Sequence, residues 1–266
     1  HQDVHSFPTR RSSDLTCLGG FCFIIHDIIE ANGGRKMVKV RLYLVRHGKT
    51  MFNTIGRAQG WSDTPLTAEG ERGIQELGIG LRESGLQFDR AYSSDSGRTI
   101  QTMGIILEEL GLQGKIPYRM DKRIREWCFG SFDGAYDGDL FMGIIPRIFN
   151  VDHVHQLSYA ELAEGLVEVD TAGWAEGWEK LSGRIKEGFE AIAKEMEEQG
   201  GGNALVVSHG MTIGTIVYLI NGMHPHGLDN GSVTILEYED GQFSVEVVGD
   251  SSYRQLGREK MEEVSI

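Results

Sequence analysis

Cysteine, proline and positive charge are all scarce in this sequence. Its 266 residues include three cysteines and five prolines, and 26 basic against 39 acidic side chains give a formal net charge of -13. Two of the cysteines, Cys17 and Cys22, lie near the N-terminus, so a disulfide framework is excluded and a reducing compartment is expected. The negative charge argues against a nucleic-acid partner. We therefore expect a cytoplasmic protein.

Long apolar runs are absent as well. The most apolar stretch near the N-terminus, residues 15–29, is shorter than the roughly 20 residues that a spanning helix needs. It also contains His26 and Asp27, which are costly in lipid. A membrane segment or a signal peptide is therefore disfavoured here, and no membrane partner is expected.

Residues 1–36 have the character of a translated leader. Residues 5–15 resemble the conceptual translation of a sequencing-adapter oligonucleotide, and residues 33–36, directly before Met37, resemble a bacterial ribosome-binding site read as codons. We expect this leader to be non-native and disordered. Residues 37–266 are then expected to form a single domain of a bacterial protein.

A buried strand with a basic end is the first functional signal. The apolar residues 42–45 predict a central strand, which stops at Arg46, His47 and Gly48. A guanidinium and an imidazole would thus lie side by side at the carboxyl end of the strand, where open α/β sheets bind ligands. Taken alone, so short a motif is weak.

The same pattern recurs in the second half of the chain. The apolar residues 204–207 end at Ser208, His209 and Gly210, and a helix is expected to follow. Strand, then His-Gly, then helix therefore occurs twice.

A third strand end carries another cation. Residues 89–93 predict a strand, and the next helix is expected to be capped by Ser94 or Asp95, with Ile100 on its apolar face. Arg98 then lies in the first turn of that helix, just past the carboxyl end of a strand.

These strand ends predict one anion site. Their placement would bring Arg46, His47, Arg98 and His209 into a single crevice. Two guanidinium groups and two imidazoles around one point form a receptor for a dianionic phosphoryl group.

The remaining pattern alternates strands and helices. A long helix with tryptophans on its apolar face is its clearest part. The other expected elements are a helix capped by Thr67, an edge strand at residues 116–120, the long helix at residues 174–196, a hairpin of residues 233–238 and 243–248 around Asp240-Gly241, and a frayed charged tail.

Several of these residues together resemble a known family. They are Arg46-His47-Gly48, Asn53, the segment from Ser93 to Thr102 with Arg98, Glu126 with Phe129-Gly130, and Ser208-His209-Gly210. In this order they resemble the histidine phosphatase superfamily, which comprises the cofactor-dependent phosphoglycerate mutases and their phosphatase relatives. The resemblance runs from about Val40 to about Thr234. It implies a three-layer α/β/α sandwich around a mostly parallel sheet, with a small cap inserted at about residues 130–173.

The resemblance also implies roles for these residues. His47 would be the nucleophile that forms a phosphohistidine, and Glu126 would be the proton donor. Further matches to phosphate- or substrate-binding positions are Arg46, Asn53, Gln59, Gly60, Arg98, His209 and Gly210, whereas Arg57 is a weaker match. This scheme requires no metal and no cofactor.

Two positions leave room for other interpretations. Lys49 departs from the acidic residue or glutamine common after Arg-His-Gly in the family, and its side chain is expected to point off the strand end. Glu126 has the alternative of a solvated acid paired with Lys122, Arg123 or Arg125.

The charge of the cap favours hydrolysis over phosphoryl transfer. Residues 129–173 contain one basic side chain, Arg147, against eight acidic ones. The mutases of the family carry extra arginines and lysines after the glutamate for a substrate with a carboxylate and a second phosphate. We therefore expect a phosphomonoesterase acting on a small phosphorylated metabolite, and the alternative is a cofactor-dependent phosphoglycerate mutase.

Other classes of function are weaker. A non-catalytic phospho-ligand binding module is disfavoured because every catalytic position is filled. A metal-dependent phosphoesterase would need ligands such as His153 with His155, or His224 with His226, and neither pair has a carboxylate or cysteine at convincing spacing. The sequence is compatible with a homodimer.

Overall fold

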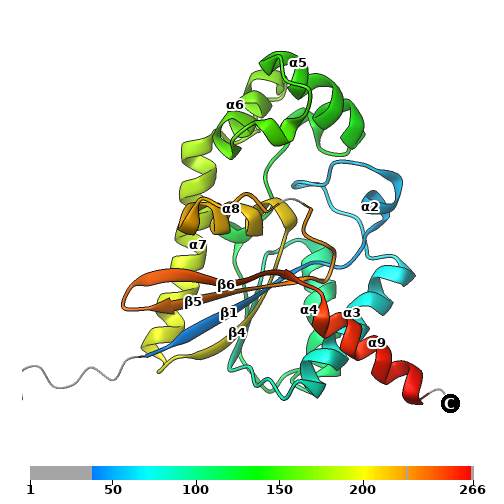
Figure 1. Cartoon of the computed structure of the whole chain (residues 1–266), viewed down its shortest axis with the longest axis vertical. Coiled ribbons are helices and arrows are strands. Elements are labelled where there is room, and N and C mark those ends of the chain that lie inside the picture. Colours follow the sequence, from blue (N-terminus) through cyan, green and yellow to red (C-terminus); the bar gives the residue numbers. More distant parts are fainter. Residues whose placement is uncertain (1–37, 226, 265–266) are drawn as a thin grey trace, which may run out of the picture. The chain divides into compact units, whose positions relative to one another are not determined.

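The computed structural model describes residues 38–225 and 227–264 (Figure 1). The expected leader at residues 1–36 lies outside the described residues, and so does His226. Within the described part of the chain, no helix is both long and apolar enough to cross a membrane.

A six-stranded sheet forms the centre of the fold, in the order β3-β2-β4-β1-β5-β6. The first four strands in this order pair in parallel, whereas β5 pairs antiparallel with β1 and with β6. The strands are β1 (Val40–Arg46), β2 (Arg90–Ser93), β3 (Tyr118–Met120), β4 (Gly202–Ser208), β5 (Val233–Glu239) and β6 (Gln242–Asp250). The expectation of a mostly parallel sheet, with residues 116–120 contributing an edge strand and a hairpin near the C-terminus, is confirmed.

Helices cover both faces of this sheet (Figure 1). Because side chains alternate along a strand, Leu42 and Leu44 of β1 join one core with α7 and α8, while Tyr43 and Val45 join a second core with α3 and α4. The helices are α2 (Met51–Ile55), α3 (Ala68–Glu83), α4 (Gly97–Glu109), α5 (Ile145–Phe149), α6 (Tyr159–Val169), α7 (Trp178–Glu198), α8 (Gly210–Asn221) and α9 (Ser252–Val264). The three-layer α/β/α fold is confirmed.

The C-terminal tail is not frayed, and that prediction is wrong. The tail forms α9, which packs against α3. The two helices cross at Gly80 and Gly257, where a Cβ on either residue would overlap backbone of the other helix. Buried Glu76 of α3 accepts hydrogen bonds from Arg254 and Arg258 of α9. The charges of the tail therefore have partners that no local sequence pattern reveals.

Two helix starts also differ from the predictions. The N-cap of α4 is Ser96, not Ser94 or Asp95, and Ile100 is 37% exposed rather than on the apolar face. By contrast, Thr67 caps α3 as expected, accepting a hydrogen bond from the Gly70 N–H at 3.0 Å.

The long helix α7 starts at Trp178 with Gly177 as its N-cap, four residues later than predicted. Trp174 is 69% exposed and precedes the helix. Its backbone N–H donates to the Asp170 carboxylate, as do those of Ala172 and Ala175. A carboxylate that organises a turn thus replaces the expected first helical turn.

The cap segment, defined here as residues 130–173, is made of short helical pieces. It contains α5, α6, the π-helix η3 (Gly138–Ile144) and two short turns, η2 (Gly130–Phe132) and η4 (Val154–Gln156). Another turn, η1 (Lys122–Ile124), precedes it. In Figure 1 the cap segment lies beside the loop that holds α2. Pieces this short explain why the sequence shows little periodicity here.

Candidate active site

The carboxyl ends of β1, β2 and β4 meet at one edge of the sheet. Backbone hydrogen bonds continue past the strand ends, from the His47 N–H to Ser208 O at 3.1 Å and from the Ser94 N–H to Val207 O at 3.1 Å. This register places the two His-Gly segments side by side, with ring centroids of His47 and His209 5.3 Å apart. The two histidines that the sequence places at strand ends therefore lie together at this edge.

His47 uses one ring nitrogen in a hydrogen bond and leaves the other without a partner among the described residues. Its Nδ1 lies 2.8 Å from Gly48 O, and because a carbonyl only accepts, Nδ1 carries the hydrogen and Nε2 the lone pair. No residue in the described part of the chain bonds to Nε2. The ring is 3% exposed, and burial, followed by the charges of Arg98 and Arg46, lowers its pKa well below 6.5. The imidazole is thus neutral at pH 7.

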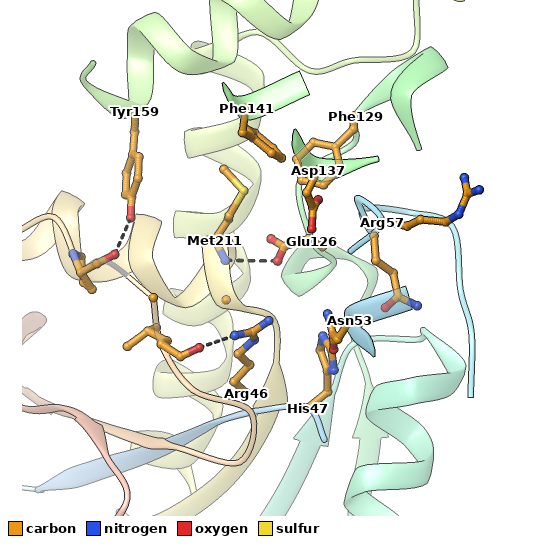
Figure 2. A pocket seen from close by; sticks show the side chains of 15 residues that line it. Arg46, His47, Asn53, Arg57, Glu126, Phe129, Asp137, Phe141, Tyr159 and Met211 are labelled. Atoms are coloured by element: carbon orange, nitrogen blue, oxygen red, sulfur yellow. Dashed lines mark hydrogen bonds between the residues drawn. The ribbon is translucent and has the colours of Figure 1, made fainter. Parts of the chain in front are cut away.

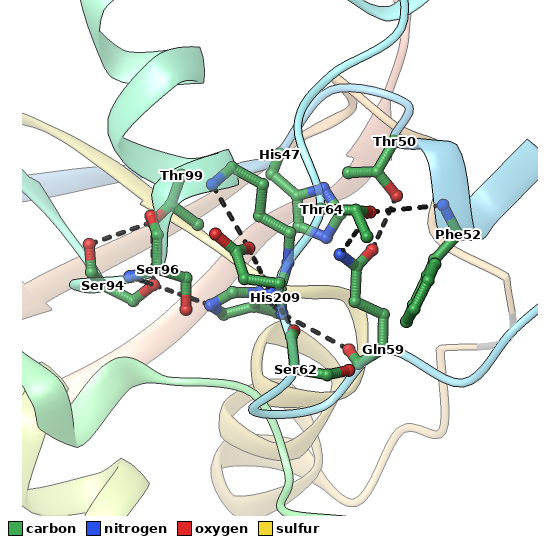
Figure 3. A network of polar contacts seen from close by, with 12 residues as sticks. His47, Thr50, Phe52, Gln59, Ser62, Thr64, Ser94, Ser96, Thr99 and His209 are labelled. Carbon is green, nitrogen blue, oxygen red and sulfur yellow. Dashed lines mark hydrogen bonds and ion pairs between the residues drawn. The ribbon is translucent and has the colours of Figure 1, made fainter. Parts of the chain in front are cut away.

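His209 has both ring nitrogens engaged (Figure 3). Arg98 donates to its Nδ1 at 2.9 Å, so the hydrogen sits on Nε2, which donates to Ser94 Oγ at 2.7 Å. Ser94 Oγ in turn lies 2.8 Å from Thr99 Oγ1. Burial and the charge of Arg98 also lower the pKa of His209 well below 6.5. This ring is a neutral, fixed part of a hydrogen-bond chain.

Two buried arginines lie beside these rings. Arg98 is fully buried, and its terminal nitrogens donate to the carbonyl oxygens of Ser62 and Gly60 and to the Asp63 carboxylate. Arg46 donates to Leu228 O. Burial lowers the pKa of both guanidinium groups, but arginine stays cationic. The Nε of each is buried and has no hydrogen-bond partner among the described residues.

Glycine at position 210 keeps the approach to Arg46 open. A Cβ there would lie 3.2 Å from Arg46 Nε, tighter than most such contacts. Gly60 has a different reason for lacking a side chain, since a Cβ would overlap Trp127 O. Its carbonyl accepts from Arg98, so Gly60 packs behind the crevice.

The loop after β1 holds two amides against the crevice. Asn53 forms a capping box with Thr50 at the start of α2. Gln59 accepts from Thr50 Oγ1 at 2.6 Å and donates to Thr64 Oγ1 at 2.9 Å. Both amides are therefore fixed before any ligand binds. Lys49 points away and pairs with Glu69 at 2.8 Å.

Glu126 lies at the N-terminus of α8. Its Oε1 accepts from the backbone N–H of Trp127 and of Thr212 and from Thr212 Oγ1, and its Oε2 accepts from the Met211 N–H. A helix N-terminus favours such an anion. The residue is 6% exposed, so the alternative of a solvated surface acid is wrong.

The neighbouring cations have other partners. Arg123 pairs with Asp121, and Arg125 pairs with Asp95 at 2.5 Å. Behind Glu126, Arg184 donates to the backbone carbonyls of residues 123, 125 and 126 and pairs with buried Glu176 at 2.6 Å. Arg184 therefore fixes the backbone of the segment that carries Glu126.

These side chains line a cavity of about 210 Å³ (Figure 2). Arg46, His47, Asn53, Gln59, Glu126 and Gly210 form its floor, as predicted. Arg98, His209 and Gly60 do not line the cavity. Arg98 donates to Gln59 O, and the ring of His209 lies against that of His47. The other walls are formed by Arg57, Phe129, Asp137, Phe141, Tyr159, Met211, Pro225, Gly227 and Leu228.

Comparison with known proteins identifies the family. Residues 42–251 match the model of the histidine phosphatase superfamily (branch 1). The chain belongs to this superfamily. A probable phosphoglycerate mutase GpmB of Salmonella choleraesuis is 31% identical over 226 residues, covering 80% of this chain and 94% of that protein.

Solved structures of the superfamily agree. A phosphoglycerate mutase from Bacillus anthracis superposes with a TM-score of 0.79 at 38% identity, covering 84% of this chain and 98% of that one. A putative alpha-ribazole-5'-P phosphatase from Escherichia coli superposes with a TM-score of 0.59 at 25% identity, covering 79% and 96%. The proteins similar to this chain thus include some named as mutases and some named as phosphatases. The reaction therefore has to be inferred from the site.

Several residues of this superfamily site are not evident from the sequence. Asp137, Phe141 and Tyr159 reach the cavity from the cap segment, where neither periodicity nor a motif predicts their direction. The acidic, aromatic-rich composition of that segment was the one available signal. In the described residues, no three His, Cys, Asp or Glu side chains gather into a metal-binding group, and His226 lies outside those residues.

Proposed function

We propose that this protein is a phosphomonoesterase that hydrolyses a small phosphorylated metabolite through a phosphohistidine on His47. The observation that carries the proposal is the state of His47. Its Nδ1–H is bound by Gly48 O, and its neutral Nε2 borders the cavity. A neutral imidazole with a free lone pair is the form that attacks phosphorus.

The surrounding cations supply the charge stabilisation that phosphoryl transfer needs. The transition state spreads negative charge over the equatorial oxygens, so positioning and cationic donors provide most of the rate acceleration. In our proposal Arg46 and Arg98 hold the phosphoryl group, His209 positions Arg98 through its Nδ1, and Asn53, Gln59, Gly60 and Gly210 shape the site. Asn53 and Gln59 cost little to order because they are already fixed by Thr50.

Glu126 is proposed to handle the protons. Its Oε2 accepts one hydrogen bond, against three at Oε1, so Oε2 is the oxygen that can carry a proton. It protonates the leaving alcohol as His47 is phosphorylated, and the resulting carboxylate then activates water to hydrolyse the phosphohistidine.

Phosphoglycerate mutase is the second candidate because the relatives from Salmonella choleraesuis and Bacillus anthracis carry that name. A mutase has to bind a carboxylate and a second phosphate. The cations that line the cavity are Arg46 and Arg57, and Arg57 already donates to Gly134 O and stacks on Tyr136 at 4.3 Å. This shortage of free positive charge supports hydrolysis.

The test combines product analysis with trapping of the intermediate. Purified protein is assayed against a panel of phosphate esters, with 3-phosphoglycerate plus bisphosphoglycerate included, in the presence and absence of EDTA. We expect release of inorganic phosphate, insensitivity to EDTA, and an acid-labile, base-stable phosphate on the wild-type protein.

Each other outcome has a distinct meaning. Transfer between positions of phosphoglycerate without net hydrolysis would establish the mutase instead. Loss of activity in EDTA would point to a metal-dependent esterase. An acid-stable label on Ser, Cys or Asp would overturn the phosphohistidine mechanism.

A further inference from the structure

Asp137 is the carboxylate of the cap segment that lines the cavity, and its side chain has no hydrogen-bond or salt-bridge partner among the described residues. It lies at the start of η3 and lines the cavity, where Figure 2 shows it reaching in above Glu126. Its carboxylate accepts no hydrogen bond, and burial raises its pKa while Arg46 lowers it. A half-buried acid without a hydrogen-bond partner is costly, and a cationic or hydrogen-bonding group of a ligand would offset that cost.

Other acids near the cavity are already engaged. Asp133 accepts from the backbone N–H groups of Gly60, Ser62 and Phe129. Glu126 is held by the start of α8. Asp137 therefore stands apart as an acceptor that the protein itself leaves unused.

The walls around Asp137 are apolar and aromatic. Phe129 and Phe141 meet edge to face with centroids 5.6 Å apart, and Tyr159 and Met211 complete the lining on this side. Tyr159 is fixed because its hydroxyl donates to Pro225 O at 3.3 Å. This surface suits an aromatic or branched apolar group rather than a polar chain.

No cation on the cap side could hold a carboxylate of the substrate. Arg57 is committed to Gly134 O and to the Tyr136 ring, and Arg46 belongs to the floor. A negatively charged group placed between the aromatic walls would face Asp137 without compensation.

We infer that the cavity selects phosphomonoesters whose alcohol carries an apolar, ring-sized body and, beyond it, a protonated amine that pairs with Asp137. The inference rests on the proposed function, because it places the phosphoryl group at His47. The cavity of about 210 Å³ fits a small molecule.

The test uses three esters that differ in one group. They are the phosphates of phenols bearing a para 2-aminoethyl, ethyl or 2-carboxyethyl chain, compared by kcat/KM at pH 7. We expect the amine to exceed the ethyl ester by about tenfold or more, the ratio that a hydrogen bond to a charged group provides. The carboxylate is expected to be the poorest substrate.

Two variants test whether the preference for the amine ester depends on Asp137. In Asp137→Asn the ratio of amine to ethyl ester should fall to within about threefold. Asp139→Asn makes the same charge change at an exposed residue outside the cavity lining and should keep the wild-type ratio. If Asp137→Asn does not fold, the order of kcat/KM for the three esters on the wild-type protein tests the inference instead.

Binding separates this inference from the proposed function. Dissociation constants of the same esters are measured on His47→Ala, which cannot form the intermediate. Tightest binding of the amine without turnover by wild-type protein would overturn the esterase and keep the selectivity. Hydrolysis of all three at equal kcat/KM, or an unchanged ratio in Asp137→Asn, would overturn the inference alone.

Discussion

The molecule contains the same local pattern twice, a parallel strand followed by His-Gly and a helix, and the two copies differ in hydrogen bonding. In the β1 copy, His47 donates from Nδ1 to the carbonyl of its own neighbour, Gly48, and keeps Nε2 free of described partners. In the β4 copy, His209 uses Nδ1 for Arg98 and Nε2 for Ser94. One imidazole therefore has a ring nitrogen without a described partner, whereas both ring nitrogens of the other are engaged.

The helices that follow the two histidines differ as well. The short helix α2 caps itself through Thr50 and Asn53. The longer α8 leaves its first N–H groups to Glu126. The repeated sequence pattern therefore predicts the same backbone arrangement in both copies. The hydrogen-bond partners of each copy differ, because they come from other parts of the chain.

Removing the two imidazoles in turn is the strongest test of this difference. We expect His47→Gln to lower kcat by about 10⁴-fold or more, as when a covalent nucleophile is lost. His209→Gln should cost about 10²-fold, because it disturbs the position of Arg98 rather than the bond that forms. Phosphoprotein labelling and steady-state kinetics measure both. Label retained by His47→Gln but lost from His209→Gln would exchange the roles of the two copies.

Substitution of Glu126, which binds the first N–H groups of α8, tests the difference between the starts of α2 and α8. Glu126→Gln should slow hydrolysis of alkyl phosphates by about 10²- to 10⁴-fold and that of para-nitrophenyl phosphate far less, since this phenolate leaves without a proton. Asp133→Asn is the matched control. Asp133 accepts only backbone N–H groups, so its loss should slow both substrates by the same factor. Equal effects of Glu126→Gln on both substrates would remove Glu126 from proton transfer.

The smallest effect concerns stability against pH. Burial holds the pKa values of His47 and His209 well below 6.5, the ordinary value expected in the unfolded chain. Below pH 6.5 the unfolded chain therefore binds protons that the folded protein does not. The free energy of unfolding is therefore highest above pH 6.5. It decreases as the pH falls below 6.5, by up to about 1.4 kcal/mol per pH unit for each of the two histidines.

Urea unfolding at pH 7.5, 6.5 and 5.5 measures this slope. His209→Gln should show a shallower loss of stability than the wild-type protein over this range. Carboxylates with lowered pKa values, such as Glu76 and Asp95, titrate below this window and do not obscure it. The same slope in both proteins would show that His209 is not held neutral by the fold.

The residues at the strand ends could be predicted because their positions follow from the pairing of the strands. Parallel strands bring their carboxyl ends to one edge, so Arg46, His47 and His209 had to meet once the strands were recognised. Glycine at position 210 follows from the same geometry, because it borders Arg46.

The walls depend on contacts between distant segments, which local patterns do not contain. Asp137 reaches the cavity through the packing of the cap segment, and the tail becomes α9 through Glu76 of α3. Ser94 was expected to cap a helix, but its hydroxyl bonds to His209, 115 residues away. A polar residue at a strand end can cap a helix or bond to a distant side chain, and only the tertiary structure shows which of the two it does.

The place of β1 in the sheet has a consequence for how the protein is made. Its neighbours are β4 and β5, and roughly 160 residues separate Val40 from Gly202, its partner in β4. At about 5–20 residues per second, the strand that carries His47 leaves the ribosome on the order of ten seconds before its partners exist. The apolar residues at its centre stay exposed for that interval, so we expect a shortage of chaperones to lower the yield of folded protein more than a destabilising surface mutation does.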